Sequence, residues 1–200
     1  MMARRSDHSR EELHDLALEA AEGIAEKDGL RGLTARGVAR EIGYTIGTIY
    51  NLFDDFDDLI VHLNARTLDS LYDVLAKVRM GKGSEKDLIA LSKAYSRFTT
   101  QHALLWRMLF EHRLPEGRSP PDWYYERVNR LYELIEMALE PLFDAQEKKR
   151  KRHTARVLWG SLHGLLSLSG QDRIGGEKPS HLAETMITYF VRGLRVGKTI

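Results

Sequence analysis

A short segment near residue 45 combines side chains that can hydrogen-bond to nucleic acid. Residues 45–51 read T-I-G-T-I-Y-N, and Arg36 lies a few residues earlier. Hydroxyl groups and the free N–H groups at a helix start donate to phosphates, while Asn and Arg side chains pair bidentately with adenine and guanine. The chemistry that these types favour is contact with double-stranded DNA, and the candidate residues are Thr34, Arg36, Thr45, Ile46, Gly47, Thr48, Tyr50 and Asn51.

Two short helices must hold these side chains in place. Thr34 is a good N-cap for a helix over 34–42, Gly43 supplies a turn, and a further helix follows over 46–52. Ile49 and Phe53 anchor the latter helix from its inner face, so the polar residues point outward. This pattern is typical of a helix-turn-helix with its reading motif at about 33–53. The spacing alone also suits a capped helical hairpin inside an all-α core.

The run from Thr34 to Leu59, T-A-R-G-V-A-R-E-I-G-Y-T-I-G-T-I-Y-N-L-F-D-D-F-D-D-L, resembles the signature of the TetR family of bacterial transcription regulators. The identical positions are Thr34, Ala39, Gly43, Gly47, Thr48, Tyr50, Phe53 and Leu59. The resemblance implies a chain of about 200 residues and nine helices, with the DNA-binding helices first and a ligand-binding, dimer-forming core behind them.

The segment departs from the family pattern in its charges. Phe56 stands where the family often has a phosphate-contacting Lys, and Ile46 stands where a polar or basic residue is common. Four aspartates lie in residues 54–58, and residues 1–60 are net acidic. Because neutralising the DNA backbone normally supplies much of the affinity, we expect weak binding to the DNA phosphates. Arg4, Arg5 and Arg10 are candidates for a minor-groove arm or for a solvated tail.

Apolar residues recur at helical spacing nearly throughout the chain, which predicts an all-α fold. We assign residues 1–60 to the three-helix DNA-binding domain and 61–200 to a helical regulatory and dimerisation domain. Beyond the two short helices, the predicted helices span about 9–28, 55–80, 85–100, 102–113, 120–144, 148–171 and 179–197.

The composition excludes several classes of protein. The chain of 200 residues is 42% hydrophobic and 30% charged with a net charge of +1, as expected of a soluble globular protein. It has no cysteine and no apolar run of about 18 residues, so we expect no membrane span and a cytoplasmic protein. No metal-ligand spacing and no nucleophile–base pair stands out. We therefore predict no catalytic residues, no metal, no cofactor and no enzymatic activity.

Aromatic and histidine side chains crowd the middle of the predicted core. A pocket between helices is typically apolar with a few polar groups, and this set could line one for an unidentified small-molecule effector. Ordinary core packing is the alternative for each residue. The candidates are Tyr95, Phe98, His102, Trp106, Phe110, Trp123, Tyr124, Trp159 and His163.

A second local resemblance lies at residues 158–164, L-W-G-S-L-H-G, which are similar to the Trp-His-Gly motif of one TetR subgroup. The family implies that the last two long helices pair with their copies in a partner chain. The candidate interface residues are Leu158, Leu162, Leu165, Leu166, Leu168, Met186, Phe190 and Leu194. Packing of the same faces within one chain is the alternative. A two-fold protein would match a two-fold DNA site.

These observations favour a homodimeric, ligand-responsive repressor acting on a palindromic operator. The alternatives are an all-α enzyme or small-molecule-binding protein that has lost DNA binding, and an activator that needs no small ligand. The basic run 148–152, K-K-R-K-R, suits either nucleic-acid binding or a solvated helix face.

Overall fold

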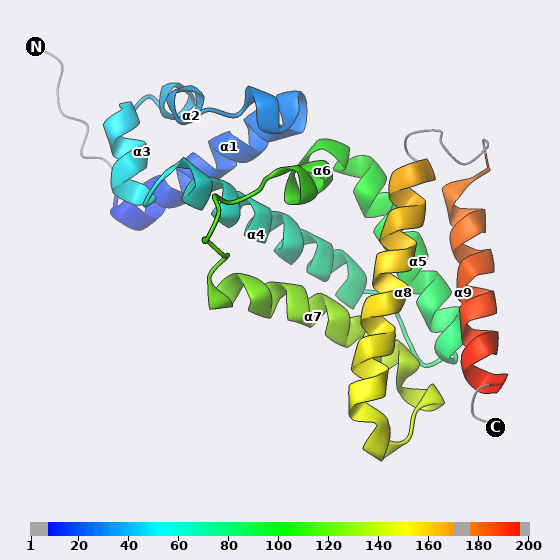
Figure 1. Ribbon diagram of the computed structural model, residues 1–200. Coiled ribbons are helices and arrows are strands. Elements are labelled where there is room, and N and C mark those ends of the chain that lie inside the picture. The colour runs from blue at the N-terminus through cyan, green and yellow to red at the C-terminus, as the bar shows by residue number, and fades with distance from the viewer. Residues whose placement is uncertain (1–7, 170–176, 197–200) are drawn as a thin grey trace, which may run out of the picture. The chain divides into compact units, whose positions relative to one another are not determined.

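The computed structural model describes residues 8–169 and 177–196, and all regular structure in these residues is helical (Figure 1). The predicted all-α class is confirmed. No helix among the described residues is long and apolar enough to cross a membrane. The elements are α1 (Arg10–Gly32), α2 (Ala35–Glu41), α3 (Ile46–Leu52), α4 (Phe56–Ala76), α5 (Ser84–Gln101), α6 (Ala103–Glu111), α7 (Asp122–Leu139), α8 (Lys148–Ser169) and α9 (Pro179–Val196), with 3-10 turns at Glu140–Leu142 and Ala145–Glu147.

The first helices begin and bend at residues with the right local chemistry. The Ser9 hydroxyl accepts from the Glu12 N–H at 3.2 Å, and the Glu12 carboxylate accepts from the Ser9 N–H at 2.6 Å, forming a capping box. Thr34 caps α2 by accepting from the Gly37 N–H at 3.0 Å. Gly29 has a φ of +65° and kinks α1 where the sequence predicted an end. These two predictions, the Thr34 cap and the Gly29 break, are confirmed.

Two predicted helices are too long. The helix predicted over 55–80 ends at Ala76 as α4, and the helix predicted over 120–144 ends at Leu139 as α7, where a 3-10 turn follows. Pro141 lies in that turn. Because proline lacks an N–H and clashes with the carbonyl four residues before it, the α-helix cannot continue through it.

The chain divides into two compact units, and each contains residues from two separate stretches. The first unit comprises the described residues up to Asp69 together with His102–Tyr124. The second comprises Ser70–Gln101 together with the described residues from Tyr125 onward. The division falls inside α4, so this helix belongs to both units. The first unit is therefore larger than the module that we assigned to residues 1–60, because α6 and the loop after it return to it.

The first unit is built on close contact between α1 and α6. Ala17, Ala21 and Ala25 are fully buried along one side of α1. Their small side chains allow a neighbouring backbone to approach closely, and Leu105 and Met108 of α6 belong to the same apolar cluster. This core also includes the inner faces of α2 and α3, so it fixes the helix-turn-helix against α1.

In the second unit, α9 packs against both α5 and α8, and α8 and α9 lie side by side (Figure 1). Ile187 and Val191 of α9 are buried in this core. At its edge the Thr188 hydroxyl donates to Glu85 at 3.0 Å. These contacts join α9 to α5 and α8.

Two cations of the basic run at the start of α8, Lys151 and Arg152, lie close to acids that precede the run. Lys151 forms an ion pair with Glu140, and Arg152 lies 3.9 Å from Glu136. The acids precede the run in sequence, on α7 and on the turn that follows it. Lys151 and Arg152 therefore join α8 to the end of α7 and to the turn after it.

Candidate nucleic-acid interface and ligand pocket

The turn between α2 and α3 has the backbone geometry that sequence analysis expected. Gly43 has a φ of +75°, a conformation that costs other residues about 1–2 kcal/mol. The Tyr44 N–H donates to the Ala39 carbonyl at 2.9 Å, which closes the turn. Ile49 and Phe53 are buried, so the inner face of α3 is held in the core.

The outer face of this motif carries the predicted DNA-contact residues. Tyr50 is 49% exposed and Ile46 is 41% exposed. Thr48 is half-buried, and its hydroxyl lies 3.2 Å from that of Thr45. Thr45 occupies the N-cap position of α3 but makes no capping hydrogen bond. The other exposed candidates are Thr34, Arg36, Thr45, Gly47 and Asn51.

The candidate arm is described only in part. Arg4 and Arg5 lie outside the described residues. Arg10 is the first residue of α1, and its guanidinium donates to the backbone carbonyl of Asn51 at 3.3 Å. Arg10 therefore fastens the end of α3 to α1 and leaves the Asn51 amide out of that bond.

The acidic turn before α4 is engaged by partners that sequence analysis did not foresee. Asp55 caps α4 by accepting from the Asp58 N–H at 2.8 Å. It also pairs with Arg118, and this guanidinium holds the pKa of the Asp55 carboxyl below its usual range. Asp57 lies 2.8 Å from His112 Nε2. No local pattern could link these pairs, because the partners come from the loop after α6.

The aromatic residues predicted for a ligand pocket fall in both units. Tyr95, Phe98, Trp159 and His163 lie in the second unit. The remainder lie in the first unit, namely His102, Trp106, Phe110, Trp123 and Tyr124.

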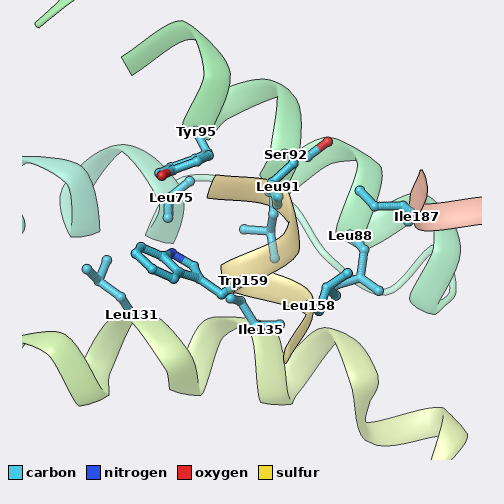
Figure 2. A pocket seen from close by; sticks show the side chains of 11 residues that line it. Leu75, Leu88, Leu91, Ser92, Tyr95, Leu131, Ile135, Leu158, Trp159 and Ile187 are labelled. Atoms are coloured by element: carbon cyan, nitrogen blue, oxygen red, sulfur yellow. The ribbon is translucent and has the colours of Figure 1, made fainter. Parts of the chain in front are cut away.

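The second unit has an apolar cavity around Trp159. Figure 2 shows the indole of Trp159 pointing toward Leu75 and Leu131. The cavity volume is about 30 Å³, and the free space reaches about 440 Å³ when its opening to solvent is included. A drug-sized ligand usually fills several hundred Å³, so occupation requires the side chains to move apart. The lining residues are Leu75, Leu88, Leu91, Ser92, Tyr95, Leu131, Ile135, Leu158, Trp159, Leu162 and Ile187.

A chain of hydrogen bonds lies beside this cavity. The Tyr95 hydroxyl is 2.9 Å from His163 Nδ1, and the Ser167 hydroxyl is 3.3 Å from His163 Nε2. The His163 ring stacks on Trp159 with 5.1 Å between centroids. Burial lowers the pKa of His163 and raises that of Tyr95. A neutral imidazole has one donor and one acceptor nitrogen, so it can satisfy both hydroxyl groups.

The residues predicted for the dimer interface differ in how far they are buried within one chain. Leu158, Leu162 and Leu166 are buried in the core of the second unit. Leu165, Met186, Phe190 and Leu194 are half-buried. Leu168, also predicted for the interface, is exposed, and the other exposed apolar residues of these helices are Val157 on α8 and Tyr189 and Val196 on α9.

Small residues accompany that exposed stripe. A Cβ added at Gly160, Gly164 or Gly193 would meet no atom within 4 Å. These positions leave open space along α8 and α9. Among the described residues, no group of three or more His, Asp or Glu side chains is placed to hold a metal ion.

Comparison with known proteins identifies the family. The family model for the tetracycline repressor-like C-terminal domain matches residues 88–190. The chain belongs to the TetR family of transcriptional regulators. It is similar to an uncharacterized HTH-type transcriptional regulator from Mycobacterium tuberculosis, with 23% identity over 171 residues, 84% of this chain and 74% of the relative.

Solved structures share the fold. A protein of unknown function from Rhodococcus sp. RHA1 is similar with a TM-score of 0.75 and 21% identity, covering 96% of this chain and all of the other. A TetR transcriptional regulator from the same organism is similar with a TM-score of 0.66 and 18% identity, covering 91% of this chain and 94% of the other. The arrangement of an N-terminal helix-turn-helix and a C-terminal helical domain is thus that of the TetR fold.

Proposed function

We propose that this TetR-family chain is a ligand-responsive repressor that binds a palindromic DNA operator as a homodimer. The observation that carries the proposal is the two-sided nature of α3. Its inner face is anchored by Ile49 and Phe53, while Ile46 and Tyr50 are exposed on its outer face. Ile46 and Tyr50 are four residues apart and so share one exposed face of the helix, and the major groove offers thymine methyl groups to such side chains.

The exposed residues take separate roles in this proposal. Tyr50 and Thr34 donate to phosphates and fix the orientation of α3, since phosphate contacts position a protein without reading sequence. Asn51 reads adenine and Arg36 reads guanine in the major groove. Gly47 lets the start of α3 approach the DNA closely. The Thr45 and Thr48 hydroxyls donate to phosphates at the start of the same helix.

For the dimer we propose the exposed stripe of α8 and α9. Val157, Ser161, Gly164 and Leu168 recur at intervals of three or four residues and so share one face of α8. The open glycine positions allow a second helix pair to approach. This face replaces the buried leucines as the centre of the interface, and the half-buried Leu165, Met186, Phe190 and Leu194 lie toward its edge. We also propose that the chain belongs to the TetR subgroup that carries the Trp-His-Gly motif, because residues 158–164 resemble that motif.

The effector site is proposed at the apolar cavity beside Trp159, Tyr95 and His163. Since the cavity is small, a ligand there would favour a conformation in which α4 and its neighbours have moved. α4 is about 31 Å long at 1.5 Å per residue, so tilting it by roughly 10° shifts its end by about 5 Å. Half-sites lie about 34 Å apart, and such a shift would end simultaneous docking of both subunits.

The test of DNA reading starts from duplexes of random sequence selected on the purified full-length protein. We expect an enriched two-fold sequence, and at least about tenfold weaker binding by Tyr50→Ala or Asn51→Ala. Tyr125→Ala is the matched control, because Tyr125 is 47% exposed on α7, close to the exposure of Tyr50. If few phosphates are contacted, the affinity for DNA should decrease only slightly as the salt concentration rises.

Two results would contradict this function. One is the absence of any enriched sequence, which would favour the alternative of a small-molecule-binding protein or enzyme that has lost DNA binding. The other is unchanged operator affinity in both Tyr50→Ala and Asn51→Ala.

The dimer is tested by placing a charge on the exposed stripe. Val157→Asp should give a monomer by analytical ultracentrifugation and lose operator binding. Val74→Asp, at an exposed valine of α4, is the control that should stay dimeric. A dimer of unchanged stability in Val157→Asp would exclude this face as the interface.

A further inference from the structure

A second hollow lies within the first unit, in the same compact body as the helix-turn-helix. It is formed by α4, the end of α6 and the loop that leads to α7, and its volume is about 390 Å³. This is the size of a typical small-molecule site, about 300–1,000 Å³. It shares no lining residue with the cavity around Trp159.

Asn64 of α4 lines this hollow and has an unusual environment. The side chain is 3% exposed, and its Oδ1 has no hydrogen-bond partner among the described residues. A buried polar atom without a partner costs about 1–3 kcal/mol, so most such atoms are paired. The terminal torsion of an Asn amide is broad, so a modest turn can present either its oxygen or its NH₂ to a ligand.

The other polar residues that line the hollow are mostly basic. Arg113 is exposed and makes no ion pair or hydrogen bond with the described residues. Arg118 pairs with Asp55 through Nη1, and a guanidinium has five N–H donors. His112 also lines the wall, where its Nε2 lies near Asp57. This arrangement leaves donor groups that suit a carboxylate.

The remaining wall is apolar. Val61, Leu109 and Leu114 contribute aliphatic surface, and Tyr124 contributes an aromatic ring. A ring packs favourably against both kinds of surface. The lining of the hollow therefore combines apolar side chains, basic side chains and the buried amide of Asn64.

We propose that this hollow binds a small aromatic hydroxy acid. The carboxylate pairs with Arg113 and Arg118, the ring packs on Leu114 and Tyr124, and the hydroxyl satisfies Asn64. The site is distinct from the apolar effector cavity of the second unit, and it lies in the unit that carries the DNA-contact residues.

Binding there competes with a contact of the resting protein. The ligand carboxylate and Asp55 both attract the Arg118 guanidinium. Asp55 also caps α4, the helix that follows the reading helix. Asp55→Asn keeps a good N-cap residue but removes the charge that holds Arg118, so it should bind the acid more tightly.

The test is calorimetric titration of the full-length protein with salicylate as the probe and salicylamide and benzoate as its analogues. Salicylate should bind with a dissociation constant below about 1 mM. Salicylamide, which lacks the charge, should bind at least about tenfold more weakly, since charge-assisted hydrogen bonds are the strong ones. Benzoate, which lacks the hydroxyl, should bind severalfold more weakly.

Variants locate the site. Arg113→Met should weaken salicylate binding at least about tenfold, while Arg97→Met, at an exposed arginine of the second unit, should leave it unchanged. Asp55→Asn should strengthen it severalfold, and Asn64→Leu should weaken it. Arg113 is exposed, so this variant should fold normally.

Three results would overturn the proposal. They are no salicylate binding up to about 10 mM, equal affinity for salicylate and salicylamide, and unchanged affinity in Arg113→Met. Because the readout is direct binding, failure here is distinguishable from failure of operator recognition, which is measured on DNA.

Discussion

Removing the Tyr95 hydroxyl tests how the second unit is held together beside its cavity. Tyr95 is 3% exposed, and its hydroxyl lies 2.9 Å from His163 Nδ1. Tyr95→Phe keeps the ring and the packing but deprives His163 of a partner. We expect the free energy of unfolding to fall by about 1–2 kcal/mol, because the hydrogen bond is lost and His163 Nδ1 stays partly shielded from water without that partner.

A double-mutant cycle separates this bond from packing. His163→Phe retains a ring that can stack on Trp159 but removes the imidazole nitrogen that pairs with the Tyr95 hydroxyl. The double variant lacks both groups of this hydrogen bond, so its destabilisation should be at least about 1 kcal/mol smaller than the sum of the two single changes. Urea denaturation followed by far-UV circular dichroism measures this, at one fixed protein concentration because a dimer's stability depends on concentration.

The same pair sets a pH dependence. Burial lowers the pKa of His163 from its ordinary value of 6.5, so the unfolded chain takes up the proton first. The stability due to neutral His163 is therefore complete above about pH 7 and is lost as the pH falls from 6.5 through the lower folded pKa. In His163→Phe, this decrease in the free energy of unfolding between pH 8 and pH 5.5 should be absent. Additive single changes within about 0.3 kcal/mol, or an unaltered pH profile in His163→Phe, would refute the reasoning.

Three further substitutions test local features by urea denaturation. Gly43→Ala should cost about 1–2 kcal/mol because of the positive φ, and an unchanged stability would show that the turn tolerates a side chain. Thr34→Ala should cost about 1 kcal/mol through loss of the α2 cap, with little effect if solvent replaces the cap. Asp87→Ala should cost about 1–2 kcal/mol, because its carboxylate accepts from the backbone N–H groups of Gly81 and Lys82. Stability equal to wild type there would mean that the loop is held by other contacts.

Local chemistry allowed much of the fold to be predicted from the sequence. Thr34 and Gly43 mark the ends of α2, and Ile49 and Phe53 mark the buried side of α3. Each of these assignments depends on a few neighbouring residues, because caps, turns and helical periodicity act over a few positions. Pro141 carried an equally local signal, and the predicted helix wrongly ran through it.

The pairings between distant segments could not be predicted. Asp55 and Arg118 belong to one unit only because α6 and its loop return to it. The sequence indicated that the acidic turn weakens binding to DNA phosphates. In the structure, the carboxylates of Asp55 and Asp57 pair with Arg118 and His112. Likewise, nothing in the sequence indicated that the aromatic residues divide between two units.

The passage of α4 through both units has a consequence for sequence change. The helix runs unbroken across Asp69 and Ser70, where one unit ends and the other begins. Each residue of an α-helix advances the chain by about 100° around the axis. Deleting one residue at this point would put the buried faces of the two halves of α4 out of phase by that angle, while inserting a whole number of turns would nearly restore the phase. Related regulators should therefore vary in loop length far more readily than in the length of this helix.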